Sequence, residues 1–195
     1  MASNIDRASP PATAAAPIIF LECDGVLATY RCIASDFDEG EPELVHCTAA
    51  GNAGQTPLEK RLLQNLKFVV DATGARIVLT TTWRAVPEMR EFLALALASI
   101  ELSPDAIIGD TEHLPDAGRG GEVRRWLDKH PQYAEFVVFD EDRSGYEDDT
   151  REASYCANNL QARLVKTLMH ASDPLDEGLT RAKAELAIQM LTTRP

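Results

Sequence analysis

The sequence lacks both a long apolar run and clusters of basic residues. No stretch approaches 18 consecutive apolar residues, so no segment is predicted to span a membrane. Only 19 Lys and Arg residues stand against 31 Asp and Glu, which gives a formal net charge of −12. A surface this acidic opposes broad contact with a nucleic-acid backbone or an anionic membrane, because both contacts need clustered cations. We therefore expect neither as a partner.

Cysteine is also scarce. The four cysteines are Cys23, Cys32, Cys47 and Cys156, and they include no Cys-x-x-Cys pair. This spacing argues against a disulfide framework and favours reduced thiols, so we expect an intracellular, cytoplasmic protein. A zinc site made by Cys32, His46 and Cys47 is an open alternative, although its spacing matches no established zinc pattern.

The first 16 residues contain hardly any large apolar side chain. Residues 1–16 cannot offset the entropic cost of ordering, so we expect a flexible tail. They also lack the basic start and apolar middle of a secretory signal. The remainder, residues 17–195, fits one domain, and the sequence contains no visible internal repeat or second domain.

The most informative stretch is residues 18–27, in which four apolar residues run into Glu22, Asp24 and Gly25. A short apolar run that stops abruptly predicts a strand buried on both faces of a parallel sheet. Open α/β sheets bind ligands at the carboxyl ends of their strands. Strand alternation places Glu22 and Asp24 on one face, with Cys23 pointing away as a small buried residue. Two clustered carboxylates repel each other without a cation between them, which predicts a Mg²⁺ site.

A second apolar run, residues 136–139, also ends in acidic residues, Asp140 and Glu141. Two separate strands that both end in acidic pairs are difficult to explain by chance. We therefore predict that both strand ends contribute to one site for a divalent metal ion.

Strands and helices alternate along the rest of the chain. Further apolar runs predict strands over residues 76–79, 105–108 and 164–167. Capping residues and helical periodicity predict helices over residues 57–73, 87–98 and 121–130, and a last helix after Thr180. This alternation predicts an α/β fold, a single Rossmann-like three-layer α/β/α domain with a five-stranded parallel sheet. With the first strand between the second and the fourth, the strand ends converge at one point.

The sequence Glu22-Cys-Asp-Gly-Val-Leu resembles motif I of the haloacid dehalogenase (HAD) superfamily, Asp-x-Asp-Gly-(Val/Thr)-Leu. Three further segments are similar to one branch, the small HAD domain found alone or in multidomain RNA-repair proteins. They are Ile-Val-Leu-Thr-Thr-Thr-Trp-Arg, Gly-Glu-Val-Arg-Arg-Trp-Leu and the Gly-Leu-Thr before the last helix. The resemblance covers residues 17–192 and implies a HAD-like phosphatase fold. It departs at Glu22, where the family has Asp.

The resemblance implies phosphoryl transfer to a motif I carboxylate. Glu22 stands at the position of the nucleophile, and Asp24 at that of the general acid and base. It also implies a Mg²⁺ ion held by Glu22, the backbone carbonyl of Asp24, Asp140 and the outer ligand Glu141.

Two other motifs of the family fall on polar residues of this chain. The motif II hydroxyl, which binds a phosphate oxygen, is assigned to Thr80, with Thr81 as the alternative. The motif III cation is assigned to Arg119, just before the helix predicted at residue 121, with Arg124 as a further candidate. Residues 28–55 fall where the family has a flap and a first cap insertion. For the acidic run over residues 36–43, a solvated loop without a ligand is the favoured alternative.

Two functions from different classes follow. The first is a Mg²⁺-dependent phosphohydrolase that acts on a phosphorylated small molecule, with turnover impaired by Glu22. The added methylene moves the carboxylate by roughly 1 Å, and misplacement on that scale can cost about 10²-fold in rate. The alternative is a catalytically inactive pseudophosphatase that binds a protein partner or serves as a scaffold. RNA end repair, by analogy with the branch, is a third hypothesis that the negative charge disfavours. The sequence leaves the substrate and the oligomeric state open.

Overall fold

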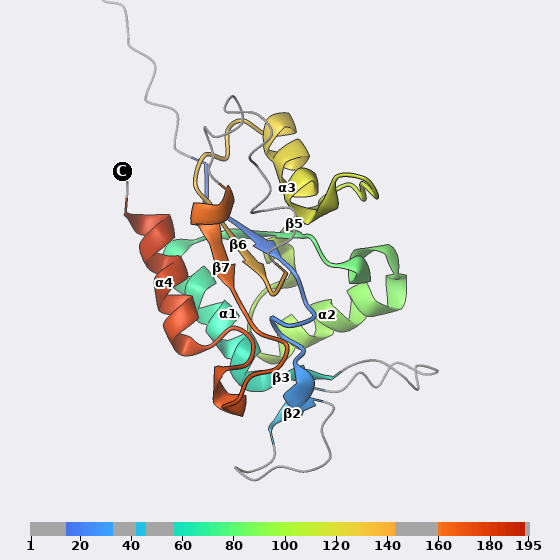
Figure 1. Ribbon diagram of the computed structural model, residues 1–195, viewed down its shortest axis with the longest axis vertical. Coiled ribbons are helices and arrows are strands. Elements are labelled where there is room, and N and C mark those ends of the chain that lie inside the picture. Colours follow the sequence, from blue (N-terminus) through green and yellow to red (C-terminus); the bar gives the residue numbers. More distant parts are fainter. Residues whose placement is uncertain (1–14, 33–41, 46–56, 143–159, 194–195) are drawn as a thin grey trace, which may run out of the picture.

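The computed structural model describes residues 15–32, 42–45, 57–142 and 160–193. Its centre is a sheet of five parallel strands in the order β5-β4-β1-β6-β7 (Figure 1). The strands are β1 (Ile18–Leu21), β4 (Arg76–Leu79), β5 (Ile107–Asp110), β6 (Phe136–Asp140) and β7 (Leu164–Lys166). The helices are α1 (Lys60–Thr73), α2 (Pro87–Ser99), α3 (Gly118–Lys129) and α4 (Arg181–Thr192). The predicted fold class is confirmed, and β1 lies between β4 and β6 as expected.

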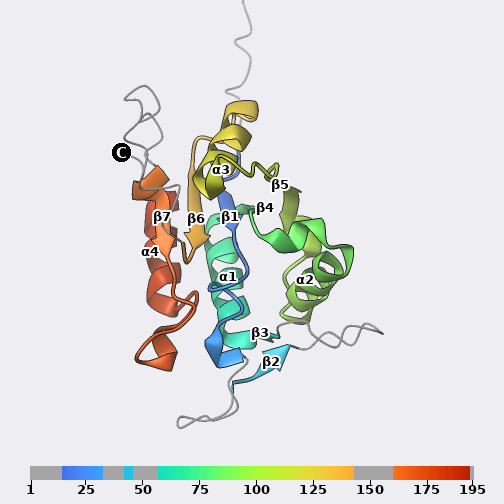
Figure 2. The same ribbon diagram turned by 45° about the vertical axis from the view of Figure 1, so that its right-hand side comes forward.

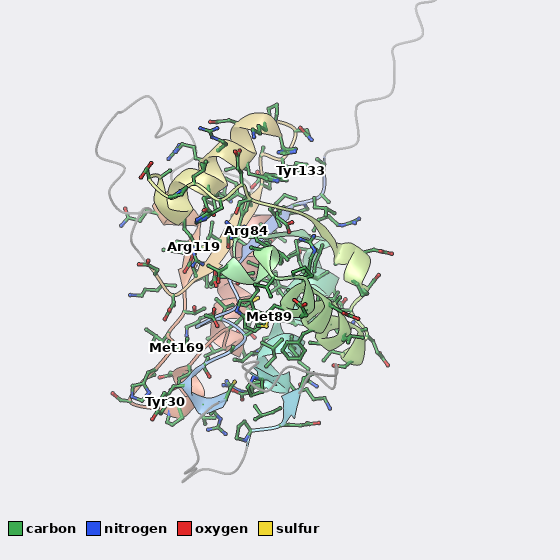
Figure 3. All side chains as sticks on the ribbon, turned by 90° about the vertical axis from the view of Figure 1, so that its right-hand side faces the viewer. Tyr30, Arg84, Met89, Arg119, Tyr133 and Met169 are labelled. Carbon is green, nitrogen blue, oxygen red and sulfur yellow. The ribbon has the colours of Figure 1, made fainter. Side chains whose placement is uncertain are left out.

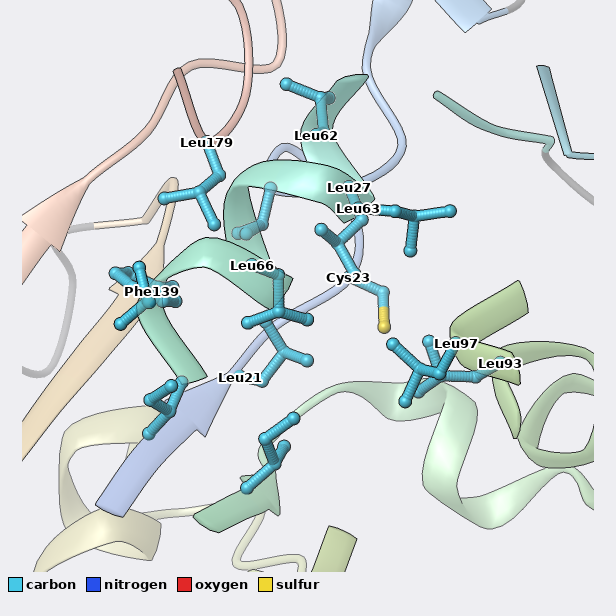
Figure 4. Packing of buried hydrophobic residues seen from close by; sticks show 14 of the residues in the cluster. Leu21, Cys23, Leu27, Leu62, Leu63, Leu66, Leu93, Leu97, Phe139 and Leu179 are labelled. Carbon is cyan, nitrogen blue, oxygen red and sulfur yellow. The ribbon is translucent and has the colours of Figure 1, made fainter. Parts of the chain in front are cut away.

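Helices cover both faces of the sheet and so complete three layers (Figure 2). Side chains alternate between the two faces along each strand, so Ile19 and Leu21 of β1 join one core cluster while Ile18 and Phe20 join the other. α1, α2 and α4 pack in the first cluster, part of which is seen in Figure 4, and α3 packs in the second. Because both faces are covered, the central strands are apolar throughout.

The start of α1 differs from the prediction. The sequence predicts a first helical residue at Pro57, but α1 begins at Lys60, because Leu58–Glu59 forms the short strand β3. β3 pairs antiparallel with β2 (Leu44–Val45), a partner that the local sequence pattern does not reveal. The end of α1 agrees with the prediction, since Gly74 adopts a left-handed conformation and donates its N–H to the carbonyl of Val70.

Two boundaries near the candidate site also differ. β5 begins at Ile107 rather than at residue 105, because Pro104–Ala106 forms a 3-10 turn capped by the side chain of Ser103. α3 begins at Gly118 rather than at residue 121. Arg119 therefore lies in the first turn of α3 and not in the loop before it.

Several predictions concern segments outside the described residues. These segments include most of the tail over residues 1–16, Thr56, the proposed zinc ligands His46 and Cys47, and most of the flap or cap region over residues 28–55. Within that last region the structure describes a 3-10 turn, η1 (Tyr30–Cys32), and β2. None of the helices in the described parts of the chain is both long enough and apolar enough to cross a bilayer.

The loop before α4 is closed tightly against the loop after β1. The backbone N–H of Gly178 donates to the carbonyl of Leu168, and that of Leu179 donates to the carbonyl of Val26. Gly178 has a φ of 68°, and a Cβ atom there would lie 2.5 Å from a Leu62 methyl carbon and 2.7 Å from the carbonyl oxygen of Val26. Only glycine fits this position without displacing its neighbours.

Replacing Gly178 with Ala should therefore destabilise the protein more than replacing Gly74 with Ala. Gly74 has nearly the same φ, 67°, but a Cβ atom there would meet nothing within 4 Å. Gly74→Ala should cost only the left-handed backbone strain, about 1 kcal/mol. Gly178→Ala should cost about 1–3 kcal/mol more through steric overlap. Urea unfolding of both variants measures the difference, and equal losses would contradict the packing described here.

Candidate active site

The backbone hydrogen bonds of the sheet continue to the residues that carry the first motif. The N–H of Glu22 donates to the carbonyl of Phe139 (3.1 Å), and the N–H of Thr80 donates to the carbonyl of Leu21 (2.9 Å). Glu22 and Thr80 are thereby fixed at the same edge of the sheet, where β1, β4 and β6 end. Glu22 is 2% exposed and Asp140, the last residue of β6, is fully buried.

A single cation contacts both buried carboxylates. Nη1 of Arg119 forms an ion pair with Oε2 of Glu22 and lies 3.6 Å from Oδ2 of Asp140. Figure 3 labels Arg119, in the first turn of α3, and Arg84, which lines the same pocket. Among the described residues, the contacts of Arg119 with the two carboxylates use Nη1 and leave the Nε and Nη2 groups of the guanidinium for other acceptors. The predicted assignment of Arg119 to this site therefore agrees with its position.

The alternative cation, Arg124, lies elsewhere on α3. It lines a hollow together with Arg125 and Asp128, whereas Arg119 and Thr80 line a separate pocket of about 210 Å³ at the candidate site. The structure thus favours Arg119 over Arg124.

Asp24 is only partly buried and has a different environment from Glu22. Its Oδ2 accepts a hydrogen bond from the indole Nε1 of Trp83 (3.0 Å). Burial raises the pKa of Asp24, and the hydrogen bond from Trp83 offsets part of that rise. A raised pKa favours the protonated carboxyl group, which is the form that a general acid needs.

The residues after β6 form a compact acidic turn. The N–H of Asp142 donates to Oδ1 of Asp140 (2.9 Å). Burial raises the pKa of Glu141, and the negative charges of Asp140, Asp142 and Asp24 raise it further. Glu141 also lies against the backbone of the first motif, because a Cβ atom on Gly25 would be 2.7 Å from its side chain. Any larger residue at position 25 would push Glu141 away.

The structure distinguishes the two candidate threonines. Oγ1 of Thr81 accepts from the backbone N–H of Trp83 (3.2 Å), and its side chain also bonds to Cys23. Oγ1 of Thr80 is buried and has no hydrogen-bond partner among the described residues. A buried hydroxyl group without a partner costs about 1–3 kcal/mol, so such groups tend to mark binding sites. Thr80 is accordingly the better candidate for contact with a ligand.

Cys23 points away from the carboxylates, as strand alternation predicts. It is fully buried in the first core cluster among leucine side chains (Figure 4). Burial raises the pKa of its thiol well above the usual range, only partly offset by the hydrogen bond with Thr81. The thiol is therefore neutral and belongs to the core.

Sequence reasoning missed a buried ion pair that supports the site. Nη2 of Arg84 donates to Oε2 of Glu122 (2.8 Å), and Nη1 of Arg84 donates to the carbonyl oxygens of Thr80 and Thr81. The same pair therefore joins α3 to the backbone that carries Thr80. One signal was available, since Glu122 lies four residues before Trp126 on the buried face of α3.

Glu122 makes further contacts that fix the loop before α3. Its carboxylate accepts from the N–H of Leu114 (3.0 Å) and the hydroxyl of Thr111 (3.1 Å), and it lies 3.2 Å from Nδ1 of His113. One buried carboxylate thus ties together the loop after β5, α3 and Arg84. This network holds Arg119 and Thr80 in a fixed relative position.

The donor set fits a hard metal ion in its chemistry. Glu22, Asp24, Asp140 and Glu141 are carboxylates at one edge of the sheet, and the single guanidinium of Arg119 cannot neutralise them all. Among the described residues, however, no three Asp, Glu, His or Cys side chains converge closely enough to form a metal-binding group. The structure brings Glu22 and Asp140 together around Arg119, and the charges of Asp140 and Asp24 both act on Glu141.

Comparison with known proteins gives one result. Residues 18–171 match a protein-family model described as "HAD domain in Swiss Army Knife RNA repair proteins". Neither a curated protein nor a solved structure gives a significant match.

Replacing Glu122 with Gln should destabilise the protein strongly. It leaves the buried guanidinium of Arg84 without its charged partner, and breaking a buried pair in this way costs about 3–5 kcal/mol. The matched control is Glu112→Gln, which breaks an exposed pair with Lys129 and should leave the unfolding free energy unchanged. Denaturant unfolding tests both, and similar stabilities would show that the Arg84–Glu122 pair does not support the site.

Proposed function

This chain belongs to the family of HAD domains in Swiss Army Knife RNA repair proteins, and from that premise we propose that it is a Mg²⁺-dependent phosphohydrolase. The proposed reaction is the hydrolysis of a phosphomonoester at the carboxyl edge of β1, β4 and β6. The observation that carries it is the meeting of Glu22, Thr80 and Arg119 beside one pocket. Such an arrangement combines a carboxylate nucleophile, a hydroxyl donor and a cation at one point.

In the first step, a carboxylate oxygen of Glu22 attacks phosphorus and forms an acyl phosphate. The bond between phosphorus and the ester oxygen breaks, and Asp24 donates a proton to the leaving oxygen. Oγ1 of Thr80 and the unused N–H groups of Arg119 donate hydrogen bonds to the phosphate oxygens. In the second step, Asp24 takes a proton from water, which attacks phosphorus and releases inorganic phosphate and Glu22.

Glu22 and Asp140 are the residues that would hold Mg²⁺ directly, with Glu141 as an outer ligand. When bound, Mg²⁺ supplies positive charge that offsets the repulsion between the carboxylates and the phosphate. Arg119 already contacts Glu22 and Asp140, so the chain itself provides part of this neutralisation.

A second candidate function is that of a pseudophosphatase, a protein that binds a partner without turnover. The ion pair between Glu22 and Arg119 favours it, because the nucleophile and the phosphate-binding cation neutralise each other. The longer side chain of Glu22 also departs from the Asp expected at this position, and a displacement of about 1 Å can cost about 10²-fold in rate.

The family name refers to RNA repair, which makes a terminal phosphate of RNA one member of the proposed substrate class. The net charge of −12 limits the extent of contact with a phosphate backbone. We therefore propose contact with the end of a strand, rather than along it, if RNA is the substrate.

The decisive variants change Glu22 and Asp24. The wild type should hydrolyse an aryl phosphate slowly with Mg²⁺, and Glu22→Asp should raise kcat by up to about 10²-fold because it restores the shorter nucleophile. Asp24→Asn should lower kcat by about 10²–10⁴-fold, and Glu22→Gln should abolish turnover.

Steady-state kinetics of the purified variants measure these effects, with Glu185→Gln as a control that makes the same acid-to-amide change on the exposed surface of α4. Equal rates for the wild type and Glu22→Gln would refute the proposed nucleophile. A silent wild type with an active Glu22→Asp variant would identify a disabled phosphatase and support the second candidate.

A further inference from the structure

A second pocket lies away from the candidate site, between the edge strand β5 and the carboxyl-terminal half of α3. Its volume is about 420 Å³, within the range of small-molecule sites. β5 is an edge strand of the described sheet, because it pairs only with β4 there. Three of its residues, Ile108, Gly109 and Asp110, line the pocket. The lining residues are Ile108, Gly109, Asp110, Glu112, Arg125, Trp126, Lys129, His130, Gln132 and Tyr133.

One wall of this pocket is a rigid group of aromatic rings. Trp126 stacks on His130 with ring centroids 4.0 Å apart and an interplanar angle of 22°, and its centroid lies 5.4 Å from that of Tyr133. Trp126 is anchored in the core by an edge contact with Phe20. The rings are therefore held in place before any ligand arrives, which reduces the entropic cost of stacking a flat molecule on them.

The hydrogen bonding of His130 fixes its tautomer. Its Nδ1 lies 2.7 Å from the carbonyl oxygen of Trp126, and since a carbonyl group only accepts, Nδ1 carries the proton. In the neutral ring Nε2 is then an acceptor, suited to an amino group or ring N–H of a ligand.

Two cations, Arg125 and Lys129, line the pocket together with two acidic residues, Asp110 and Glu112. Arg125 is exposed and forms no ion pair within the described residues, and Lys129 pairs with Glu112 at 2.9 Å. Asp110, the other acidic residue of the lining, is already paired with Arg90. An anionic group near Arg125 and Lys129 therefore meets positive charge, despite the net charge of −12.

We propose that this pocket binds a nucleotide, with the base against His130 and Tyr133 and the phosphate at Arg125 and Lys129. Flat aromatic walls and adjacent cations match the two halves of a nucleotide, a π-face and an anion. The nucleotide can be free or part of a strand. The shape is compatible with a strand, because a third hollow, which Arg124 also lines, connects the two pockets. It shares Arg125 and Lys129 with the nucleotide pocket and Leu114 with the pocket of the candidate site. The proposal concerns binding and does not depend on turnover at that site.

The two tryptophans of the chain report on the two sites separately. The indole N–H of Trp83 donates to Asp24 in the candidate site, and Trp126 forms the wall of the second pocket. In ¹⁵N-labelled protein, adenosine 5′-monophosphate should shift the Trp126 indole resonance saturably. Ribose 5-phosphate, which lacks the base, should bind about 5- to 100-fold more weakly. A Trp126→Phe variant assigns the two resonances.

Matched charge reversals test the role of the cations. Lys129→Glu should weaken binding of adenosine 5′-monophosphate at least about tenfold, because it replaces an attraction with a repulsion. Lys67→Glu makes the same substitution on α1, where Lys67 pairs with Asp71 at 2.8 Å, and should leave binding unchanged. The proposal is overturned if the Trp126 resonance does not respond, if ribose 5-phosphate binds equally well, or if the two reversals have the same effect.

A 5′-phosphorylated trinucleotide distinguishes the two sources of the nucleotide. Tighter binding than the mononucleotide, with shifts of both indole resonances, would identify a strand that reaches the candidate site. Equal affinity with a shift of Trp126 alone would identify a free nucleotide. If inorganic phosphate shifts neither indole resonance, the result counts against the phosphate site near Trp83. It does not count against the nucleotide pocket, whose binding depends on the base.

Discussion

Two carboxylates, those of Glu22 and Asp140, are buried at the ends of neighbouring strands, and each needs a cation nearby to be stable there. An unpaired charge in such surroundings costs several kcal/mol, so the chain must bring positive charge to this edge of the sheet. Arg119 supplies it from the first turn of α3. The position of α3 is thus tied to the chemistry of the strand ends as well as to its packing against Phe20 and Val78.

The other features of the site follow from holding that helix in place. Glu122, one turn further along α3, accepts from Arg84, and Arg84 in turn donates to the backbone at Thr80 and Thr81. The nucleophile position, the candidate phosphate-binding hydroxyl and the cation are therefore parts of one hydrogen-bonded frame. Within it, the Glu22–Arg119 ion pair is what separates the two candidate functions. If it opens when a phosphate arrives, Glu22 is free to attack, and if it stays closed, the fold serves for binding only.

Much of the fold could be predicted from the sequence, because buried parallel strands are short apolar runs with few alternatives. The prediction of β4 over residues 76–79 agrees with the structure, as do the central position of β1 and the left-handed cap at Gly74. The predicted start of α1 at Pro57 was wrong, because pairing of Leu58 with Val45 converts the expected first turn into a strand. Long-range pairing of this kind leaves no local pattern.

The candidate site was predictable only in part. Glu22, Thr80, Arg119 and Asp140 come together at one edge, whereas the catalytic and metal-binding roles assigned to them stay predictions. The choice between Thr80 and Thr81 required the hydrogen bonds of Thr81 with Trp83 and Cys23. The Arg84–Glu122 pair and the aromatic pocket beside β5 depend on contacts between distant segments, which no motif describes.

Calorimetric titration of Mg²⁺ into the purified protein and into Asp140→Asn would show whether this edge of the sheet is a cation-assisted phosphate site. The wild type should bind one Mg²⁺ ion per chain and gain about 1.4 kcal/mol in the free energy of unfolding at a Mg²⁺ concentration ten times the Kd. Asp140→Asn should bind none. The absence of Mg²⁺ binding to the wild type, or equal binding to both proteins, would rule out a cation site at Glu22 and Asp140.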